Sequence, residues 1–355
     1  MKTVGIWGFY FAENFGDDLM AIQFAQMLKS IGAQPLIFDL SPILAARFEL
    51  EATADICDFC IRSELIIIGG GNLLAQKNTW PNGPFMKKIS ELRMAAEHFM
   101  KDIHALSIGG DGAAEAVYPH AVERLLKSKC FKSALVRIKS DVRSLENIKV
   151  KASYAPDILW SSAHFFGITK TLPKSTQKTI GIHFLSNTPW IVSGMNRFRF
   201  RINQKFPSIH FKYLSAFLHD GSSGDFMPEQ EQANESTFYN GDPIEVMKCI
   251  SSLDCVISQR LHVGLISLSM QIPFISMLAH PKVKAEMSQI GWNQIIDYTG
   301  LKPRRYFGVC WLASQISSQV QRLDHVSSSV EVPLFHSSHD VFLEYKKKID
   351  SIVLA

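Results

Sequence analysis

The chain has 355 residues, 46% of them hydrophobic and 20% charged, with a formal net charge of +4 from 37 Lys and Arg against 33 Asp and Glu. This composition is typical of a globular α/β protein and excludes a largely disordered chain. The charge is too small to indicate nucleic-acid binding, but it is compatible with an anionic small substrate or weak attraction to a membrane surface. The length favours two domains over one.

The amino-terminal sequence MKTVGIWGFY passes directly into a predicted strand, without the apolar run and cleavage site of a secretion signal. No uninterrupted apolar stretch of the sequence reaches the length that crosses a membrane. We therefore expect a cytoplasmic protein and leave peripheral attachment to a membrane open. The oligomeric state is open as well.

Strands and helices alternate through the first 170 residues, a pattern that predicts a parallel sheet with helices on both faces. The predicted strands lie at residues 4–7, 36–40, 65–68, 105–108 and 134–138. The predicted helices lie at about 17–30 and 85–100, and a turn lies at 154–157. The polar stretch 169–178, TKTLPKSTQK, has a proline and no periodicity, so we expect the domain boundary there.

The second half repeats the alternation and predicts a second parallel sheet. Its predicted strands lie at residues 179–184, 210–214, 253–257 and 273–277, with a further short strand after Trp292. Its predicted helices lie near 195–205, 229, 243, 263–270 and 310–322, and 219–225 is a loop. A terminal helix at 340–353 places Phe342, Tyr345, Ile349 and Ile352 on one face, which should pack on a domain surface. The predicted domains are thus 1–170 and 179–325, with a tail at 326–355.

Six cysteines include Cys57 and Cys60 at CxxC spacing, with no second pair nearby to complete a zinc site. The segment lies ahead of a predicted strand and does not begin a helix after one, which disfavours a redox motif. We expect reduced, partly buried thiols and no metal.

The most informative stretch is SQRLH at 258–262, between a predicted buried strand and a predicted helix. It places Arg260 and His262 at a strand-to-helix turn, where parallel sheets bind ligands. The amides and dipole of a helix start favour an anion. A core histidine with a satisfied ring is the alternative for His262, and the nearby arginine makes that alternative weaker.

The first loop carries Asn14, Gly16, Asp17 and Asp18 where the first strand meets the first helix. Gly16 permits a positive φ, Asp17 can cap the helix and Asp18 favours the helix dipole. Alternatively, one of these carboxylates binds or deprotonates a sugar hydroxyl. The loop lacks the GxGxxG fingerprint of dinucleotide-binding proteins.

Two further features fall at the ends of buried strands. Gly69, Gly70 and Gly71 follow a run of isoleucines, so their amides face a ligand or, equally, the glycines allow close backbone packing. Arg137 ends the strand at 134–138, on the edge where ligands bind. A solvated arginine is the alternative, and the position favours a functional one.

Together these residues resemble the polysaccharide pyruvyl transferase family. The resemblance rests on NxGDD at Asn14, Gly16, Asp17 and Asp18, on IIIGGGNLL at 66–74, and on SQRLH at 258–262 followed by IPFI and Lys282. The motifs occur in the family's order from residue 4 to about 290. Two positions depart from it: the usual Val-Arg-Asp is Val136-Arg137-Ile138, and the tyrosine ahead of the later lysine is Leu278 or Ala279.

The resemblance implies a glycosyltransferase-B-like fold, with two Rossmann-like domains facing each other across a cleft. It implies phosphoenolpyruvate as donor, with no other cofactor and no metal. It implies a saccharide acceptor, free or lipid-linked, on which a cyclic pyruvate ketal forms. Its implied donor-binding residues are Arg137, Arg260, Leu261, His262 and Lys282. His262 would be the acid and Asp17 or Asp18 the base, with acceptor or loop contacts from Asn14, Gly16, Gly70, Gly71, Asn72 and the 80–85 loop.

Three other readings compete with this one. A glycosyltransferase of the same fold would use SQRLH to bind the diphosphate of a sugar nucleotide. A nicotinamide or flavin enzyme is disfavoured by the missing fingerprint. A non-catalytic, glycan-binding member of the family is suggested by Ile138, but the retained Arg137, Arg260 and His262 speak against it.

Overall fold

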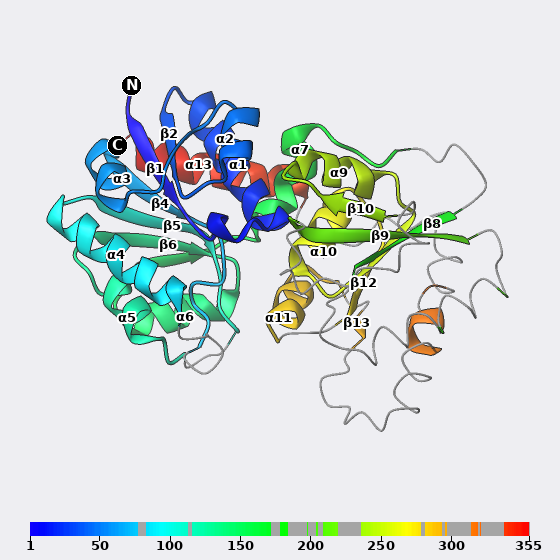
Figure 1. Cartoon of the computed structure of the whole chain (residues 1–355). Helices are drawn as coiled ribbons and strands as arrows, with labels where there is room; N and C mark the ends of the chain where they lie inside the picture. The colour runs from blue at the N-terminus through cyan, green and yellow to red at the C-terminus, as the bar shows by residue number, and fades with distance from the viewer. Residues whose placement is uncertain are drawn as a thin grey trace. The chain divides into compact units, whose positions relative to one another are not determined.

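The computed structural model describes residues 1–76, 83–112, 116–171, 178–183, 197, 204, 209–218, 236–277, 281–292, 295–296, 314–318, 320 and 337–354. The chain forms two compact units, which we call unit 1 (Met1–Ser161 with Ser338–Ala355) and unit 2 (Ser162–Ser337). Each unit holds one parallel sheet flanked by helices (Figure 1). The predicted fold class, two Rossmann-like domains with parallel sheets, is confirmed.

The sheet of unit 1 has seven parallel strands in the order β3-β2-β1-β4-β5-β6-β7. The strands are β1 (Thr3–Trp7), β2 (Gln34–Phe38), β3 (Glu51–Thr53), β4 (Leu65–Gly69), β5 (Asp102–Ile108), β6 (Phe131–Val136) and β7 (Ala152–Tyr154). The order reverses between β1 and β4, which pair in parallel. Parallel sheets bind ligands at the carboxyl ends of the strands beside such a reversal, so the loops after β1 and β4 occupy a favourable position.

The helices of unit 1 are α1 (Phe15–Ser30), α2 (Pro42–Arg47), α3 (Ile56–Arg62), α4 (Pro84–His98), α5 (His120–Leu126), α6 (Lys139–Asn147) and α13 (Ser338–Val353), with short 3-10 helices η1 (Tyr10–Ala12) and η2 (Ile158–Ser161). One face of the sheet packs against a core that includes residues of α3, α4 and α5. On α1 and α13, the rings of Phe24 and Tyr345 meet at 6.2 Å between centroids.

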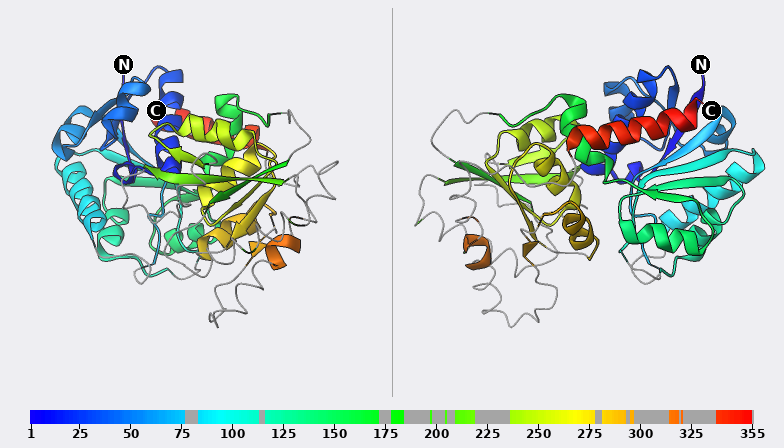
Figure 2. Two further views of the ribbon diagram at one scale, coloured as in Figure 1. Left: turned by 45° about the vertical axis from the view of Figure 1, so that its right-hand side comes forward. Right: turned by 180° about the vertical axis from the view of Figure 1, so that it is seen from behind.

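The carboxyl-terminal segment belongs to unit 1 and is not a separate tail. In α13, Tyr345 and Ile349 are buried, and the Tyr345 hydroxyl donates to the carbonyl of Pro156 at 2.9 Å. Lys2 Nζ donates to the carbonyl of Val353 at 2.9 Å, so the two chain ends lie close together (Figure 2). The predicted terminal helix therefore closes unit 1, which the predicted domain limits did not anticipate.

The sheet of unit 2 has six parallel strands in the order β10-β9-β8-β11-β12-β13. Its strands are β8 (Lys178–His183), β9 (Ile209–Leu218), β10 (Ser236–Tyr239), β11 (Cys255–Ser258), β12 (Phe274–Met277) and β13 (Ile295–Ile296). Its helices include α7 (Ser162–Phe166), α9 (Pro243–Ser251), α10 (Leu261–Ser269) and α11 (Pro281–Gln289). The order reverses between β8 and β11, so the loops after these two strands lie at a switch point.

Several predictions for unit 2 fall outside the described residues: the helices near 195–205 and 229, the loop at 219–225, and most of the helix near 310–322. The boundary between the units lies at Ser161 and Ser162, ahead of the predicted stretch 169–178. The physical reason is that the residues in between pack on unit 2. The amide of Thr171 donates to the carbonyl of Ser251 at 2.8 Å.

The prediction that the CxxC segment does not begin a helix after a strand is wrong, because α3 follows β3. Cys57 and Cys60 lie in α3, whose start is capped by Asp55, because its carboxylate accepts from the amides of Cys57 at 2.7 Å and Asp58 at 3.0 Å. Both cysteines are free; Cys60 is buried but Cys57 is exposed. Burial raises the pKa of Cys60 to about 12, which keeps it a thiol. None of the helices in the described residues has the length and apolarity to cross a membrane.

Candidate functional site

In unit 2, the SQRLH stretch forms the end of β11 and the start of α10, as predicted. Arg260 is the N-cap of α10. From Leu261 to Met270 every side chain is buried except that of His262, which is half-buried like Arg260. A helix surrounded by protein in this way can meet a ligand only at its ends. The start presents main-chain amides, the positive end of the helix dipole and a guanidinium, all of which favour an anion.

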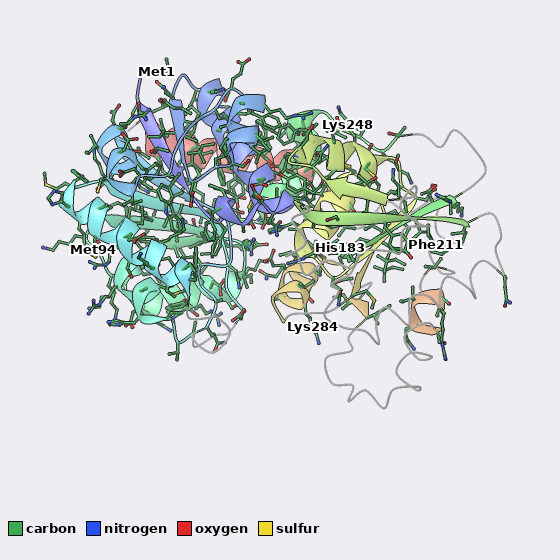
Figure 3. All side chains as sticks on the ribbon, viewed as in Figure 1. Met1, Met94, His183, Phe211, Lys248 and Lys284 are labelled. Carbon is green, nitrogen blue, oxygen red and sulfur yellow. The ribbon has the colours of Figure 1, made fainter. Side chains whose placement is uncertain are left out.

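A buried pair of side chains holds this helix start in place. The hydroxyl of Ser258 accepts from the amide of Arg260 at 2.9 Å and lies 3.1 Å from Nδ1 of His183. His183, labelled in Figure 3, ends β8 opposite Ser258 in the parallel register, and both side chains are almost fully buried. We call these two hydrogen-bonded side chains the His183–Ser258 pair. His183 was not among the predicted site residues, although its place at the end of the strand IGIH was a usable signal.

The other predicted donor residues are placed less directly. The side chain of Leu261 is only 4% exposed, so Leu261 can offer a ligand its amide but not its side chain. Lys282 is the second residue of α11, and its side chain lies outside the described residues, as do Leu278 and Ala279.

In unit 1, the loop after β1 places Asn14, Gly16, Asp17 and Asp18 at the start of α1. The prediction that Asp17 caps the helix is wrong, because Asn14 is the N-cap and its side chain accepts from the amide of Gly16 at 2.9 Å. Asp17 and Asp18 lie in the first turn, where carboxylates complement the helix dipole. Asp18 is fully buried and Asp17 is partly exposed, so Asp17 is the better placed of the two to reach a substrate.

Tyr10 links this loop to the end of β4. Its hydroxyl donates to the carbonyl of Gly69 at 2.8 Å. Burial raises the pKa of Tyr10 well above its ordinary value, and the charges of Asp17 and Asp18 add to the shift. The three side chains therefore share one neighbourhood, in which the raised pKa keeps Tyr10 neutral.

Glycine is required after β4 because side chains pack closely against the backbone there. Gly70 and Gly71 have φ of 82° and 86°, and a Cβ on them would lie 2.4 Å from the sulfur of Met20 and from the ring of Phe9, respectively. The predicted ligand-facing amide is wrong for Gly70, because that amide donates to the carbonyl of Leu106 at 2.8 Å.

The predicted acceptor residue Asn72 also makes contacts within the fold. With its NH₂ group oriented toward them, its side chain donates to the carbonyls of Gly109 and Gly110, both at 3.2 Å. Asn72 thus ties the loop after β4 to the loop after β5, and it shapes the edge of the sheet from within.

Arg137 is buried at the end of β6, where it forms an ion pair with Asp157. Its Nη1 donates to Oδ2 of Asp157 at 2.7 Å, and each side chain is 1% exposed. A Cβ on Gly109 would lie 2.5 Å from Nε of Arg137, so the guanidinium packs directly under the loop after β5. A charge this deeply buried needs its partner. The geometry therefore favours a supporting role for Arg137 over the predicted direct contact with a donor.

Asp141, which was not among the predicted site residues, holds the same loop. Its carboxylate accepts from the amide of Gly110 at 2.8 Å, and the side chain lies in the first turn of α6 with 1% exposure. Burial raises the pKa of Asp141 to about 7, although the Gly110 hydrogen bond and the charge of Arg137 act in the opposite direction. Perturbed carboxyl groups of this kind are common near functional sites.

Solved structures with the same fold match nearly the whole chain. An S. aureus MnaA–UDP co-structure matches with a TM-score of 0.60 and 9% identity over 99% of this chain and 97% of that chain. UDP-GlcNAc 2-epimerase from Neisseria meningitidis bound to UDP-GlcNAc gives 0.57 and 10% over 99% and 100%. MurG from Acinetobacter baumannii gives 0.50 and 9% over 100% and 99%. At this identity the likeness shows the fold alone, which is of the glycosyltransferase-B type.

The sequence itself identifies the family within this fold. No curated protein matches the chain. The family described as polysaccharide pyruvyl transferase matches residues 14–281, which is well over half of the chain and includes both sheet edges described above. The chain belongs to the polysaccharide pyruvyl transferase family, as the motifs predicted.

Proposed function

We propose that this protein transfers the pyruvyl group of phosphoenolpyruvate to two hydroxyls of one sugar, forming a cyclic pyruvate ketal and releasing phosphate. The observation that carries the proposal is the start of α10, a helix buried on all sides whose half-buried residues are Arg260 and His262. Membership of the family supports a transferase that acts on a polysaccharide.

Phosphoenolpyruvate is a small, dense anion that matches this helix start. The guanidinium of Arg260 can donate two parallel hydrogen bonds to the phosphate or the carboxylate of phosphoenolpyruvate. The first amides of α10, including that of Leu261, can donate to the same group. We assign Lys282 a second, compact positive charge at the donor. The His183–Ser258 pair holds the amide of Arg260 in place, so the hydrogen-bond donors of the helix start are ordered before phosphoenolpyruvate binds. Arg137 supports the edge of unit 1 through Asp157.

The chemistry needs one acid and one base. His262 donates a proton to the methylene carbon of the enol, which becomes a methyl group and leaves the central carbon electrophilic. The first sugar oxygen bonds to that carbon, and its hydroxyl proton passes to Asp17, with Asp18 as the alternative base. The carbon–oxygen bond to phosphate then breaks, and the second sugar oxygen takes its place. The proton of the second hydroxyl passes to His262, which becomes an acid again, and the proton held by Asp17 leaves with the phosphate. One phosphate leaves for each ketal formed, so atoms and charge balance.

The acceptor in this proposal is a sugar of a cytoplasmic polysaccharide precursor, free or lipid-linked, with contacts from Asn14, Gly16 and the neighbouring loops. We expect no metal and no cofactor besides phosphoenolpyruvate as co-substrate. Exopolysaccharide or another cell-surface glycan is the product class that we propose.

The test combines binding with product analysis. Phosphoenolpyruvate should raise the melting temperature of the protein, whereas UDP should not. Incubation with phosphoenolpyruvate and saccharide acceptors should release phosphate and increase the acceptor mass by one pyruvate less one water. Stabilisation by UDP alone, with transfer from a sugar nucleotide, would instead establish the glycosyltransferase alternative. Saccharide binding without phosphate release from any donor would establish the non-catalytic one.

A further inference from the structure

Unit 1 contains a pocket at the edge of its sheet opposite to the candidate site. The pocket has a volume of about 890 Å³ and is lined by the end of α4, by α5 and the turn after it, and by the starts of β5 and β6. Strands β5 and β6 are parallel, so their starts lie at the amino edge and the loops that follow them at the carboxyl edge. The pocket is therefore separate from the residues assigned to substrate binding above.

The lining of this pocket is rich in positive charge. It includes five Lys or Arg side chains against three Asp or Glu, together with His120. Three cations are ion-paired: Arg93 with Glu97, Lys127 with Glu123 at 2.5 Å, and Lys132 with Asp102 at 3.2 Å. The side chains of the last two pairs are 41–55% exposed, and ion pairs at such accessible positions are weak.

Two of the cations, Arg124 and Lys129, have no ion pair within the part of the chain that the structure describes. The pocket thus keeps an excess of two positive charges after its internal pairs are counted. An excess of this kind attracts an anionic surface over about one Debye length.

Exposed methionines accompany the charge. Met100, which lines the pocket, is 85% exposed. Met94 is 59% exposed and projects from the turn of α4 that carries Arg93 and Glu97 (Figure 3). Large apolar side chains this exposed beside a group of cations are typical of surfaces that lie on a membrane, where the apolar groups enter the headgroup region.

We propose that this surface, Arg93 to Met100 at the end of α4 together with Arg124 to Lys132, docks unit 1 on an anionic membrane. The cations contact lipid phosphates, and Met94 and Met100 enter the interface. This proposal does not depend on the proposed function, because docking is measured without substrate. Each Lys or Arg close to an anionic bilayer contributes about 1 kcal/mol, or roughly fivefold in partitioning.

The experiment is co-sedimentation of the full-length protein with vesicles of phosphatidylcholine, with and without phosphatidylglycerol. The protein should sediment with the anionic vesicles only, and added salt should release it. Arg124→Gln combined with Lys129→Gln should weaken partitioning by roughly 25-fold, at about fivefold per charge. The matched control is Lys87→Gln combined with Lys151→Gln, two neutralisations outside the pocket lining, which should change partitioning far less.

Met94→Gln combined with Met100→Gln tests the apolar part, and it should weaken partitioning at every salt concentration because it removes no charge. Circular dichroism and melting temperature should not change in any variant, since all the altered side chains are on the surface. Equal losses for the pocket and control variants would refute the assignment of the surface. Binding of inorganic phosphate to the pocket without any sedimentation would identify a soluble anion as the ligand and overturn the membrane proposal.

Discussion

The buried carboxyl group of Asp141 gives the sharpest prediction for stability. Burial raises its pKa from the ordinary value of 3.8 to about 7. In the folded state it therefore binds a proton at pH values where the unfolded chain has lost it. A group of this kind adds stability below its unfolded pKa, and the contribution is lost as pH rises through the folded one. Unit 1 should lose stability between about pH 4 and pH 8 for this reason.

The magnitude follows from the size of the shift. One pKa unit corresponds to about 1.4 kcal/mol, so ionising Asp141 in the folded state costs on the order of 4 kcal/mol. Asp141→Asn removes the titration but keeps an oxygen that can accept from the amide of Gly110. The difference in free energy of unfolding between variant and wild type should therefore change by on the order of 4 kcal/mol from pH 4 to pH 8, in favour of the variant at high pH.

The assay is urea unfolding of both proteins in matched buffers across this pH range. Other titrating groups are shared by the two proteins and cancel in the difference. Asp58→Asn, at an exposed carboxylate on α3, controls for the general effect of removing one negative charge. A difference between wild type and Asp141→Asn that stays constant from pH 4 to pH 8 would refute the assignment of a buried, proton-binding carboxyl group.

Four further predictions concern the candidate site and the thiols. Arg260→Lys keeps the positive charge but loses the paired hydrogen bonds of the guanidinium, so the affinity for phosphoenolpyruvate should fall by about 1.5–3 kcal/mol in a binding titration. His262→Asn cannot donate the proton, so turnover should fall by roughly a hundredfold with donor binding nearly unchanged; full turnover would contradict the proposed mechanism. His183→Gln and Ser258→Ala should each raise the KM for phosphoenolpyruvate, by roughly tenfold, and the double variant should do no worse than either; additive losses would mean that they act separately. Cys60→Ser should lower stability by about 1–3 kcal/mol and leave activity intact.

The sequence was sufficient where one local pattern determines the structure. The isoleucine run at 66–68 is buried on both faces of a sheet and was predicted as part of β4. The start of α10 was predicted from SQRLH, because a buried strand, a polar turn and helical spacing occur there together. The family was also predictable, because its motifs are short and local.

What the sequence could not show depends on contacts between distant residues. The ion pair of Arg137 joins residues 20 positions apart, and Arg137 was predicted as a ligand contact because only its strand was visible. His183 meets Ser258 across 75 positions through strand pairing. Strands β3 and β7 have three residues each, too few for a period of two to emerge, and so they were missed.

The departure at Ile138 shows how the structure bears on the non-catalytic alternative. The family pattern has an acid directly after the arginine, whereas Ile138 is 1% exposed and caps α6 without a side-chain hydrogen bond. Two other carboxylates lie beside the arginine: Asp157, paired with it at 2.7 Å, and Asp141, whose pKa its charge lowers against the effect of burial. The negative charge is therefore still present around Arg137, supplied by Asp157 from another position of the fold, while Asp141 keeps its proton up to about pH 7. An isoleucine at 138 changes the source of that charge without leaving a buried guanidinium unpaired, so it gives no reason to infer that this chain has lost catalysis.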